Sequence, residues 1–195
     1  MAEVKVLVEG YAKPTGGGSY KASPATVLIK DSKKLILVDP GTNKIKLIAA
    51  LKKEGIKLND IDIIFLTHYH IDHLLNIRLF PNKDVYADCT IYRDDKEIEF
   101  GDKIPGTNIL VIPTPGHAHE HVSLLADTIK GKICVAGDLW WWRDGVKQKL
   151  DRKSLLNLQD PFVKDKKALL ASRKKILSLA DYIIPGHGNM FKVQK

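Results

Sequence analysis

The sequence predicts an α/β (α+β) fold in one domain, residues 1–195, with sheets packed against each other and helices outside them. Three observations support this class. Short apolar runs rich in β-branched residues recur along the chain between turn signals, as strands do. Two longer segments have apolar residues at helical spacing. The strands come in runs and do not alternate strictly with helices, which favours stacked sheets with external helices.

The N-terminal third contains the first strands and the first helix. The expected strands are Val4–Val8, Thr26–Ile29, Leu35–Asp39 and Asp62–Thr67. Pro14 and Gly16–Gly18 are turn signals between the first two. A helix is expected from Asn43, a plausible N-cap, and Gly55 would end it.

Further strands and a second helix are expected after residue 80. The strands are Val85–Ala87, Ile109–Ile112, Val122–Ala126, Lys132–Ala136 and Tyr182–Ile184. The helix is Pro161–Ala180, whose apolar residues recur at spacings near seven. Its solvent face is predicted to carry four cations, Lys166, Lys167, Arg173 and Lys174.

Composition limits the possible classes of protein. The net charge is +8, and a basic surface can attract RNA or phosphate. Many lysines with few Gln and Met residues also fit a thermophilic organism, and we favour this second reading. Cys89 and Cys134 lie in unrelated segments without a CxxC pair, so we expect two small buried thiols and no disulfide framework.

Targeting signals are not evident. No apolar run approaches the roughly 20 residues that a membrane span needs. The opening segment MAEVKVLVEG lacks the basic region and cleavage site of a secretory signal. We therefore expect a cytoplasmic protein without a membrane partner, and the sequence leaves a homodimer open.

The stretch FLTHYHIDH (Phe65 to His73) is the first candidate site. It places three of the seven histidines and one aspartate within six residues, directly after an apolar run. His70 and His73 are three residues apart and share a helical face, whereas Asp72 points elsewhere and could serve a second ion. Imidazole and carboxylate ligands suit zinc, manganese or iron, and the absence of cysteine argues against a closed structural zinc site.

Three later residues follow the same pattern of strand, then glycine or proline turn, then polar side chain. They are His117 in TPGHAHEH, Asp138 in VAGD and His187 in IIPGHG. Taken singly, these residues could be a surface histidine, a helix cap and a turn residue. Taken together with the first stretch, they predict a metal site built on strand ends.

The motifs HYHIDH, PGH, GD and PGHG, in this order between Leu35 and Gly188, resemble the metallo-β-lactamase fold superfamily. The resemblance implies a four-layer αβ/βα sandwich with a two-metal site at one edge between the sheets. The first ion would be held by His68, His70 and His117, the second by Asp72, His73 and His187, and Asp138 would bridge them. Asp39 in LVDPGT matches the family's strand-end aspartate and would orient a ligand.

The resemblance also implies a mechanism. Two divalent ions, zinc first with iron or manganese as alternatives, would share a bridging hydroxide that attacks the substrate. Asp72 is the candidate catalytic carboxylate, as holder or acceptor of a proton. His119 and His121 are left outside the metal set. They could contact a substrate or form a minor metal site, but we favour histidines that face solvent or support a ligand. Among Trp140, Trp141 and Trp142, at least one is expected to flank the cleft, and Trp140 is the candidate that we select.

The substrate stays open at this level, because the superfamily includes hydrolases of several classes. The last third, including GDLWWWRDG and LLNLQDP, is similar to the metallo-β-lactamase domain-containing protein 1 group, although the three tryptophans depart from it. We favour a hydrolase of a small ester, thioester or lactone. The alternatives are a phosphodiesterase or endoribonuclease that uses the basic surface to bind RNA, and a relative of the mononuclear iron dioxygenases.

Overall fold

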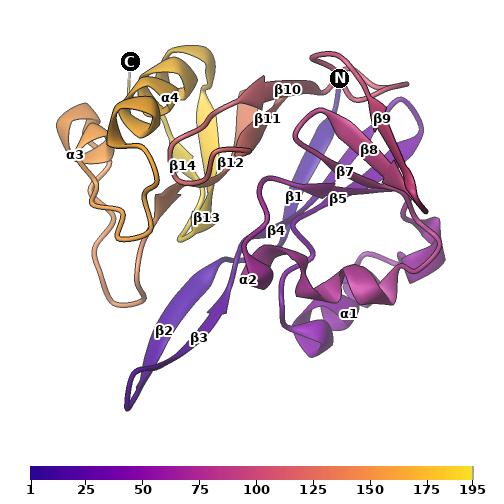
Figure 1. The fold of residues 1–195 in the computed structure, drawn as a ribbon, viewed down its shortest axis with the longest axis horizontal. Coiled ribbons are helices and arrows are strands. Elements are labelled where there is room, and N and C mark those ends of the chain that lie inside the picture. The colour runs from indigo at the N-terminus through magenta and orange to yellow at the C-terminus, as the bar shows by residue number, and fades with distance from the viewer. Residues whose placement is uncertain (195) are drawn as a thin grey trace.

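Two β-sheets face each other in the computed structural model, which describes residues 1–194, and helices lie on their outer sides (Figure 1). The first sheet has the spatial order β1 (Glu3–Val8), β4 (Thr26–Asp31), β5 (Lys34–Val38), β6 (Ile63–Leu66), β7 (Val85–Ala87), β8 (Thr90–Arg93), β9 (Lys96–Glu99). The second has the order β10 (Leu110–Pro113), β11 (Val122–Thr128), β12 (Gly131–Trp141), β13 (Tyr182–His187), β14 (Phe191–Lys192). This is the predicted αβ/βα sandwich.

Alternating side chains divide each strand between two cores. Val27 and Ile29 of β4 point between the sheets and pack with Leu124 of β11 and Val135 of β12. Leu28 of β4 points to the opposite, outer face. This period of two is what the pleat of a strand imposes, and it requires apolar residues on both faces of the central strands.

Each outer face is covered by helices. On the first sheet, α1 (Lys44–Lys53) buries Leu47 and Leu51 against Leu28 and Leu37. On the second sheet, α4 (Lys166–Leu179) buries Leu169 and Ile176 in a cluster with Cys134 of β12. The shorter helices are α2 (Ile71–Leu74), α3 (Arg152–Leu156) and the 3-10 turns η1 (Leu58–Asp60) and η2 (Leu75–Leu79). Within the described part of the chain, no helix has the length and apolarity needed to cross a bilayer.

The boundaries of α1 agree with the sequence prediction. The side chain of Asn43 accepts a hydrogen bond from the backbone N–H of Lys46 at 3.0 Å, as an N-cap does. Gly55 follows the helix with φ +71°, the left-handed conformation in which glycine ends helices.

The segment from Tyr11 to Ser23 differs from the prediction. Instead of a turn, it forms a two-stranded hairpin, β2 (Tyr11–Gly16) and β3 (Ser19–Ser23), which projects from the body of the molecule in Figure 1. Gly16, Gly17 and Gly18 all have positive φ and close the hairpin, so the glycine run makes the turn between two strands that the sequence analysis missed. The strands β8, β9 and β14 and the helix α3 were also not predicted.

The predicted helix over Pro161–Ala180 is wrong at its start and on its solvent face. It begins only at Lys166, because the backbone N–H groups of Lys164 and Asp165 donate to the carbonyl of Gly116 and hold the chain outside the helix. Arg173, placed on the solvent face by the periodicity, is buried. Its guanidinium donates to the carbonyls of Leu139 and Leu158, at 2.7 Å each, and this contact draws it inward.

Candidate metal centre

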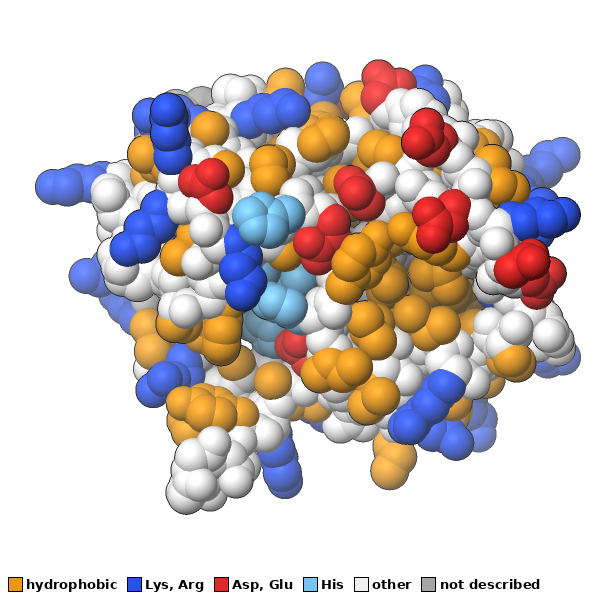
Figure 2. Space-filling model, in the orientation of Figure 1, with side chains coloured by type: hydrophobic (Ala, Val, Ile, Leu, Met, Phe, Trp, Pro, Cys, Tyr) orange, Lys and Arg blue, Asp and Glu red, His pale blue; other side chains and the backbone are white. Residues whose placement is uncertain are grey.

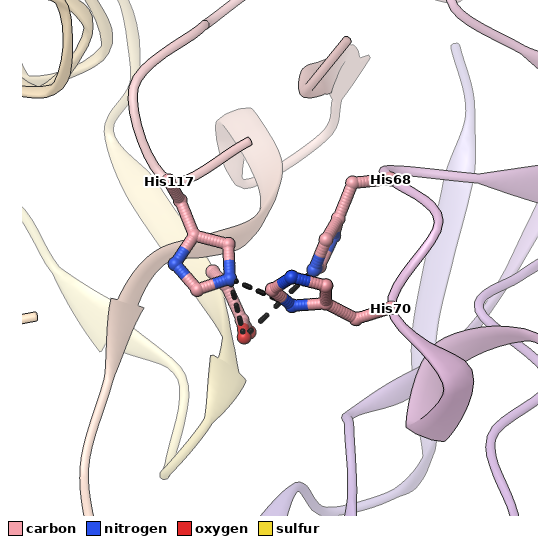
Figure 3. A group of neighbouring side chains, drawn as sticks. His68, His70 and His117 are labelled. Atoms are coloured by element: carbon pink, nitrogen blue, oxygen red, sulfur yellow. Dashed lines mark hydrogen bonds and ion pairs between the residues drawn. The ribbon is translucent and has the colours of Figure 1, made fainter. Parts of the chain in front are cut away.

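One cluster of possible ligands lies between the two sheets at the ends of their strands. Its members are His68, His70, His117 and Asp138, and their ligand atoms all lie within 4.8 Å of one another. Figure 3 shows His68 and His70, which follow β6, facing His117, which comes from the opposite half of the molecule. Nε2 of His117 is 3.0 Å from Nδ1 of His70 and 3.4 Å from Oδ2 of Asp138.

A second cluster lies next to the first. It contains Asp72, His73 and His187, again with all ligand atoms within 4.8 Å of one another. Oδ2 of Asp72 is 3.2 Å from Nε2 of His187. Oδ1 of Asp138 is 3.4 Å from Nε2 of His73 and 3.8 Å from Nε2 of His187. One carboxylate therefore faces both clusters, with Oδ2 toward the first and Oδ1 toward the second.

Glycines allow Asp138 to stand between the clusters. A Cβ atom on Gly186 of β13 would lie 1.8 Å from Oδ1 of Asp138, so no larger residue fits beside this carboxylate. Gly137 has φ +51°, and a Cβ there would lie 2.7 Å from Oγ1 of Thr67 and from Nε2 of His121. The glycines of the VAGD and PGHG motifs thus leave room around Asp138, and the same motifs contain the candidate ligands Asp138 and His187.

Outer hydrogen bonds fix the direction of three imidazoles. Nδ1 of His73 is 2.8 Å from Oδ2 of Asp39, and Nδ1 of His117 is 2.7 Å from Oδ2 of Asp160. Nδ1 of His187 is 3.0 Å from the carbonyl oxygen of Tyr11. Each of these oxygens accepts, so Nδ1 carries a proton and Nε2 is the nitrogen that points into the clusters. Metal-ligating histidines in proteins have this arrangement.

Asp39 also orients His68 through a hydroxyl group. Oγ1 of Thr67 donates to Oδ2 of Asp39 at 2.8 Å, and the N–H of Thr67 donates to Oδ1 at 2.9 Å. The hydroxyl can then accept from Nδ1 of His68 at 3.1 Å. Asp39 itself has φ +48°, an unusual conformation for a residue with a Cβ, and the buried contacts hold it there.

Three buried polar atoms at the clusters have no hydrogen-bond partner among the described residues: Nε2 of His68, Nε2 of His73 and Oδ1 of Asp138. A buried polar atom that stays unpaired costs about 1–3 kcal/mol, so such atoms require an explanation. Two sets of lone pairs from imidazole and carboxylate groups, converging in a buried space, fit divalent cations of the zinc, iron and manganese type.

Burial and mutual interaction shift the proton affinities of these groups. Burial, followed by the charge of His73, lowers the pKa of His68 well below its usual range. Burial alone would raise the pKa of Asp138, but the neighbouring His187 and His73 outweigh it and hold the pKa well below the ordinary value. At neutral pH these two groups therefore present an unprotonated imidazole and a charged carboxylate, the forms that bind a cation.

Asp160 is a site residue that the sequence analysis missed. It is buried, it accepts from His117, and its Oδ1 accepts from the backbone N–H of Phe162 at 2.9 Å and from Nε1 of Trp141 at 3.4 Å. The available signal was its Asp-Pro dipeptide with Pro161, which repeats the Asp-Pro dipeptide at Asp39.

The three consecutive tryptophans divide between core and cleft. Trp140, selected from the sequence as the cleft residue, is fully buried, and its Nε1 donates to the carbonyl of Leu155 at 2.9 Å. That selection is wrong, because the side chain points to the α3–α4 side of β12. Trp141 lines the cleft instead, and Trp142 is buried with Trp140.

The two histidines left outside the metal set have different environments. His119 is exposed and does not line the cleft described below. His121 is buried, with its ring centroid 5.2 Å from that of His68 and its Nδ1 2.9 Å from Oγ1 of Thr114. Burial, followed by the charge of His117, lowers the pKa of His121 to about 3, so it stays neutral.

Both clusters open into a cleft of about 580 Å³. Its residues are Ala12, Tyr20, Ala22, His70, Ile71, Asp72, Asp138, Trp141, Arg143, Pro161, Phe162 and His187. Figure 2 shows histidine side chains at the surface beside hydrophobic ones. A cleft of this size with mostly apolar walls and a few polar groups suits a small molecule.

The fold and the paired His/Asp clusters define a metallohydrolase, and comparison with known proteins gives the family. The family model described as Metallo-beta-lactamase superfamily matches residues 22–105. The chain is 31% identical over 201 residues to metallo-beta-lactamase domain-containing protein 1 of Xenopus laevis, covering 98% of this chain and 82% of that protein. The chain belongs to the metallo-β-lactamase superfamily.

Other similar proteins agree with this assignment. A probable metallo-hydrolase of Methanocaldococcus jannaschii is 30% identical over 194 residues, with 98% of this chain and 90% of that protein covered. A Thermotoga maritima structure assigned to the metallo-beta-lactamases has a TM-score of 0.71 at 21% identity, covering 98% of this chain and 99% of that one.

Two further structures with the same fold contain metal centres of different kinds. The dizinc quorum-quenching lactonase AidC has a TM-score of 0.63 at 20% identity and covers 86% of this chain and 74% of its own. The chemotaxis sensor ODP, with a peroxy diiron species, has a TM-score of 0.69 at 19% identity. The match covers 98% of this chain and 85% of that one. These likenesses show the fold alone.

Proposed function

We propose that the protein hydrolyses a small ester, thioester or lactone at a centre of two divalent cations. The observation that carries this proposal is the position of Asp138, whose two carboxylate oxygens face two separate ligand clusters at the base of an apolar cleft. A single ion would need only one of these clusters.

The residues of the two clusters would hold one ion each. His68, His70 and His117 would hold the first ion, Asp72, His73 and His187 would hold the second, and Asp138 would contact both. When bound, such ions lower the pKa of a coordinated water and polarise a carbonyl oxygen. Nitrogen and oxygen ligands without sulfur suit zinc, iron and manganese, and we propose zinc as the resident metal. Similar folds contain both zinc and iron centres.

The protein's own groups would position the substrate and move the proton. In hydrolysis, the water oxygen forms a bond to the acyl carbon, the C–O or C–S bond breaks, and a proton from the water passes to the leaving oxygen or sulfur. Asp72 lines the cleft, is half-buried and is the carboxylate closest to His187, so it is placed to hold this proton in transit. The rings of Trp141 and Phe162, with centroids 5.7 Å apart, would contact the acyl group and exclude water.

A substrate panel tests the proposal. Metal-loaded protein would be incubated with lactones, thioesters, bis-p-nitrophenyl phosphate and short RNA. We expect turnover of acyl substrates that is lost on chelation and restored by zinc. Cleavage of the phosphodiester or RNA without acyl turnover would favour the phosphodiesterase alternative, which the net charge of +8 supports. Complete inertness with one iron per chain would favour an iron oxygenase.

A further inference from the structure

Exposed apolar side chains gather around the cleft. Tyr20 is 55% exposed, Ile71 66% and Phe162 57%, and all three line the same space. Apolar surface that clusters around a cleft, with polar groups at its base, is typical of a wall that a ligand covers. The ring centroid of Phe162 lies 6.3 Å from those of His70 and His117 in the first cluster.

Arg143 supplies the single Lys or Arg side chain among the cleft-lining residues that the structure describes. Its Nη2 donates to the hydroxyl of Tyr20 at 3.2 Å, and its guanidinium carbon is 5.7 Å from the centroid of that ring. Among residues 1–194, no carboxylate oxygen lies within 4.0 Å of the Arg143 guanidinium nitrogens, the distance limit for an ion pair. The cation is therefore held by a neutral aromatic partner, and its charge is not neutralised.

The backbone on both sides of Arg143 is anchored. The N–H of Asp144 donates to the carbonyl of Ala12 at 3.0 Å, and Oδ1 of Asp144 accepts from the N–H of Ala12 at 2.9 Å. The N–H of Trp142 donates to the carbonyl of His187 at 3.0 Å. The backbone around Arg143 is thus held between the β2–β3 hairpin and the strand end that carries His187. The Arg143 side chain is exposed, and its hydrogen bond to Tyr20 orients the guanidinium at the cleft. Such orientation lowers the conformational entropy that the side chain loses on binding.

We propose that Arg143 is the binding site for an anionic group of the substrate. This inference rests on the proposed function and narrows it: the substrate is a small acyl compound with an apolar body against Trp141 and Phe162 and a carboxylate or phosphate at Arg143. A guanidinium fork matches either anion with two parallel hydrogen bonds. One cation and a cleft of about 580 Å³ suit a single anionic group on a small molecule better than a polyanionic strand.

Binding of inert ligands tests Arg143 without any need for turnover. Calorimetry would compare 4-phenylbutyrate, 4-phenylbutanol and phenylphosphonate on metal-loaded wild type, Arg143→Ala and Arg143→Lys. We expect wild type to prefer the carboxylate over the alcohol by at least about tenfold. In Arg143→Ala this ratio should fall to within about twofold, with Arg143→Lys between them. If phenylphosphonate binds most tightly of the three ligands and loses the most affinity in Arg143→Ala, the anionic group that the site prefers is a phosphate and not a carboxylate.

Lys147→Ala is the matched control, since Lys147 is exposed in the same segment and does not line the metal cleft. It should keep the wild-type ratio. A carboxylate preference that persists in Arg143→Ala, because the ions alone hold the anion, would overturn the inference. So would the absence of any preference in wild type.

A hydrolysis arm separates this inference from the proposed function. p-Nitrophenyl hemiglutarate and p-nitrophenyl pentanoate differ chiefly in a terminal carboxylate. We expect the ratio of their kcat/KM values to fall about tenfold in Arg143→Ala. Turnover of both esters with an unchanged ratio overturns the anion site alone. Absence of turnover with every acyl substrate overturns the proposed function, while the calorimetric ratio still decides whether Arg143 binds anions.

Discussion

Asp160 accepts a hydrogen bond from Nδ1 of His117 over 2.7 Å, and it does so from a loop 43 residues further along the chain. The contact parallels that of Asp39 with His73 at 2.8 Å. Each cluster of candidate ligands therefore has an outer carboxylate of its own, which fixes the orientation of one imidazole.

Replacing Asp160 should weaken the first ion and spare the second, whereas replacing Asp39 should weaken mainly the second ion and the first to a smaller extent. We expect Asp160→Asn to lower affinity for the first ion about 10–100-fold, because Nδ1 of His117 loses a charged acceptor. Asp39→Asn should do the same for the second ion, and also disturb His68 through Thr67. Titration with a chromophoric chelator would measure stepwise release. If the two variants act mainly on different ions, the double variant should bind both ions weakly. Metal release from the double variant that is no greater than from either single variant would contradict this.

Arg173 should be needed for stability. Its guanidinium links the carbonyl of Leu139, next to Asp138, with the carbonyls of Leu156 and Leu158, just before Asp160. Arg173→Met would leave these acceptors without a charged donor, and we expect at least about 2 kcal/mol lower free energy of unfolding in urea. Lys174→Met, at the exposed neighbouring position, should change it by less than about 0.5 kcal/mol. Equal effects at both positions would show that the buried contacts do not contribute.

Gly186→Ala should displace Asp138. The added Cβ would meet Oδ1 of Asp138 at 1.8 Å, whereas a Cβ on Gly101 has nothing within 4 Å. We expect Gly186→Ala to lose metal and Gly101→Ala to keep it, as measured by metal analysis after dialysis. A Gly186→Ala protein that kept its full metal content would contradict the placement of this carboxylate.

Trp140 and Trp141 should have separable roles. Trp140→Ala removes a fully buried side chain and should cost about 3–5 kcal/mol of stability. Trp141→Ala removes a cleft wall and should raise KM for acyl substrates with a much smaller loss of stability. Thermal unfolding and steady-state kinetics on both variants would measure this separation, and a reversal of the two effects would refute it.

The central strands of both sheets and the sequence positions of the candidate ligands were predictable because they depend on local rules. Short apolar runs rich in β-branched residues identified β4, β5 and β11, and a polar residue after a predicted strand and turn identified His68, His117 and His187. Trp140 was misassigned because the β12–β13 register shifts around Gly137, and this irregularity is not visible in the sequence. A chain position alone cannot say which of two adjacent side chains faces a cleft.

Asp160 and Arg173 depend on tertiary contacts and carry little local signal. Asp160 lies in a loop and acquires its role only when the fold brings it against His117, which is 43 residues earlier in the chain. Arg173 has the spacing of a solvent-facing residue, and only the carbonyl groups of distant loops make burial of its charge favourable. Periodicity reports the average environment of a helix face and cannot show such partners.

Metal content per chain tests the central claim most directly. Protein purified without chelators and supplied with zinc would be analysed by mass spectrometry of its elements, beside an Asp138→Ala variant whose fold is verified by circular dichroism. The account predicts two ions per wild-type chain and a marked loss in the variant, since this carboxylate faces both clusters. One ion in wild type, or two ions retained in Asp138→Ala, would contradict it.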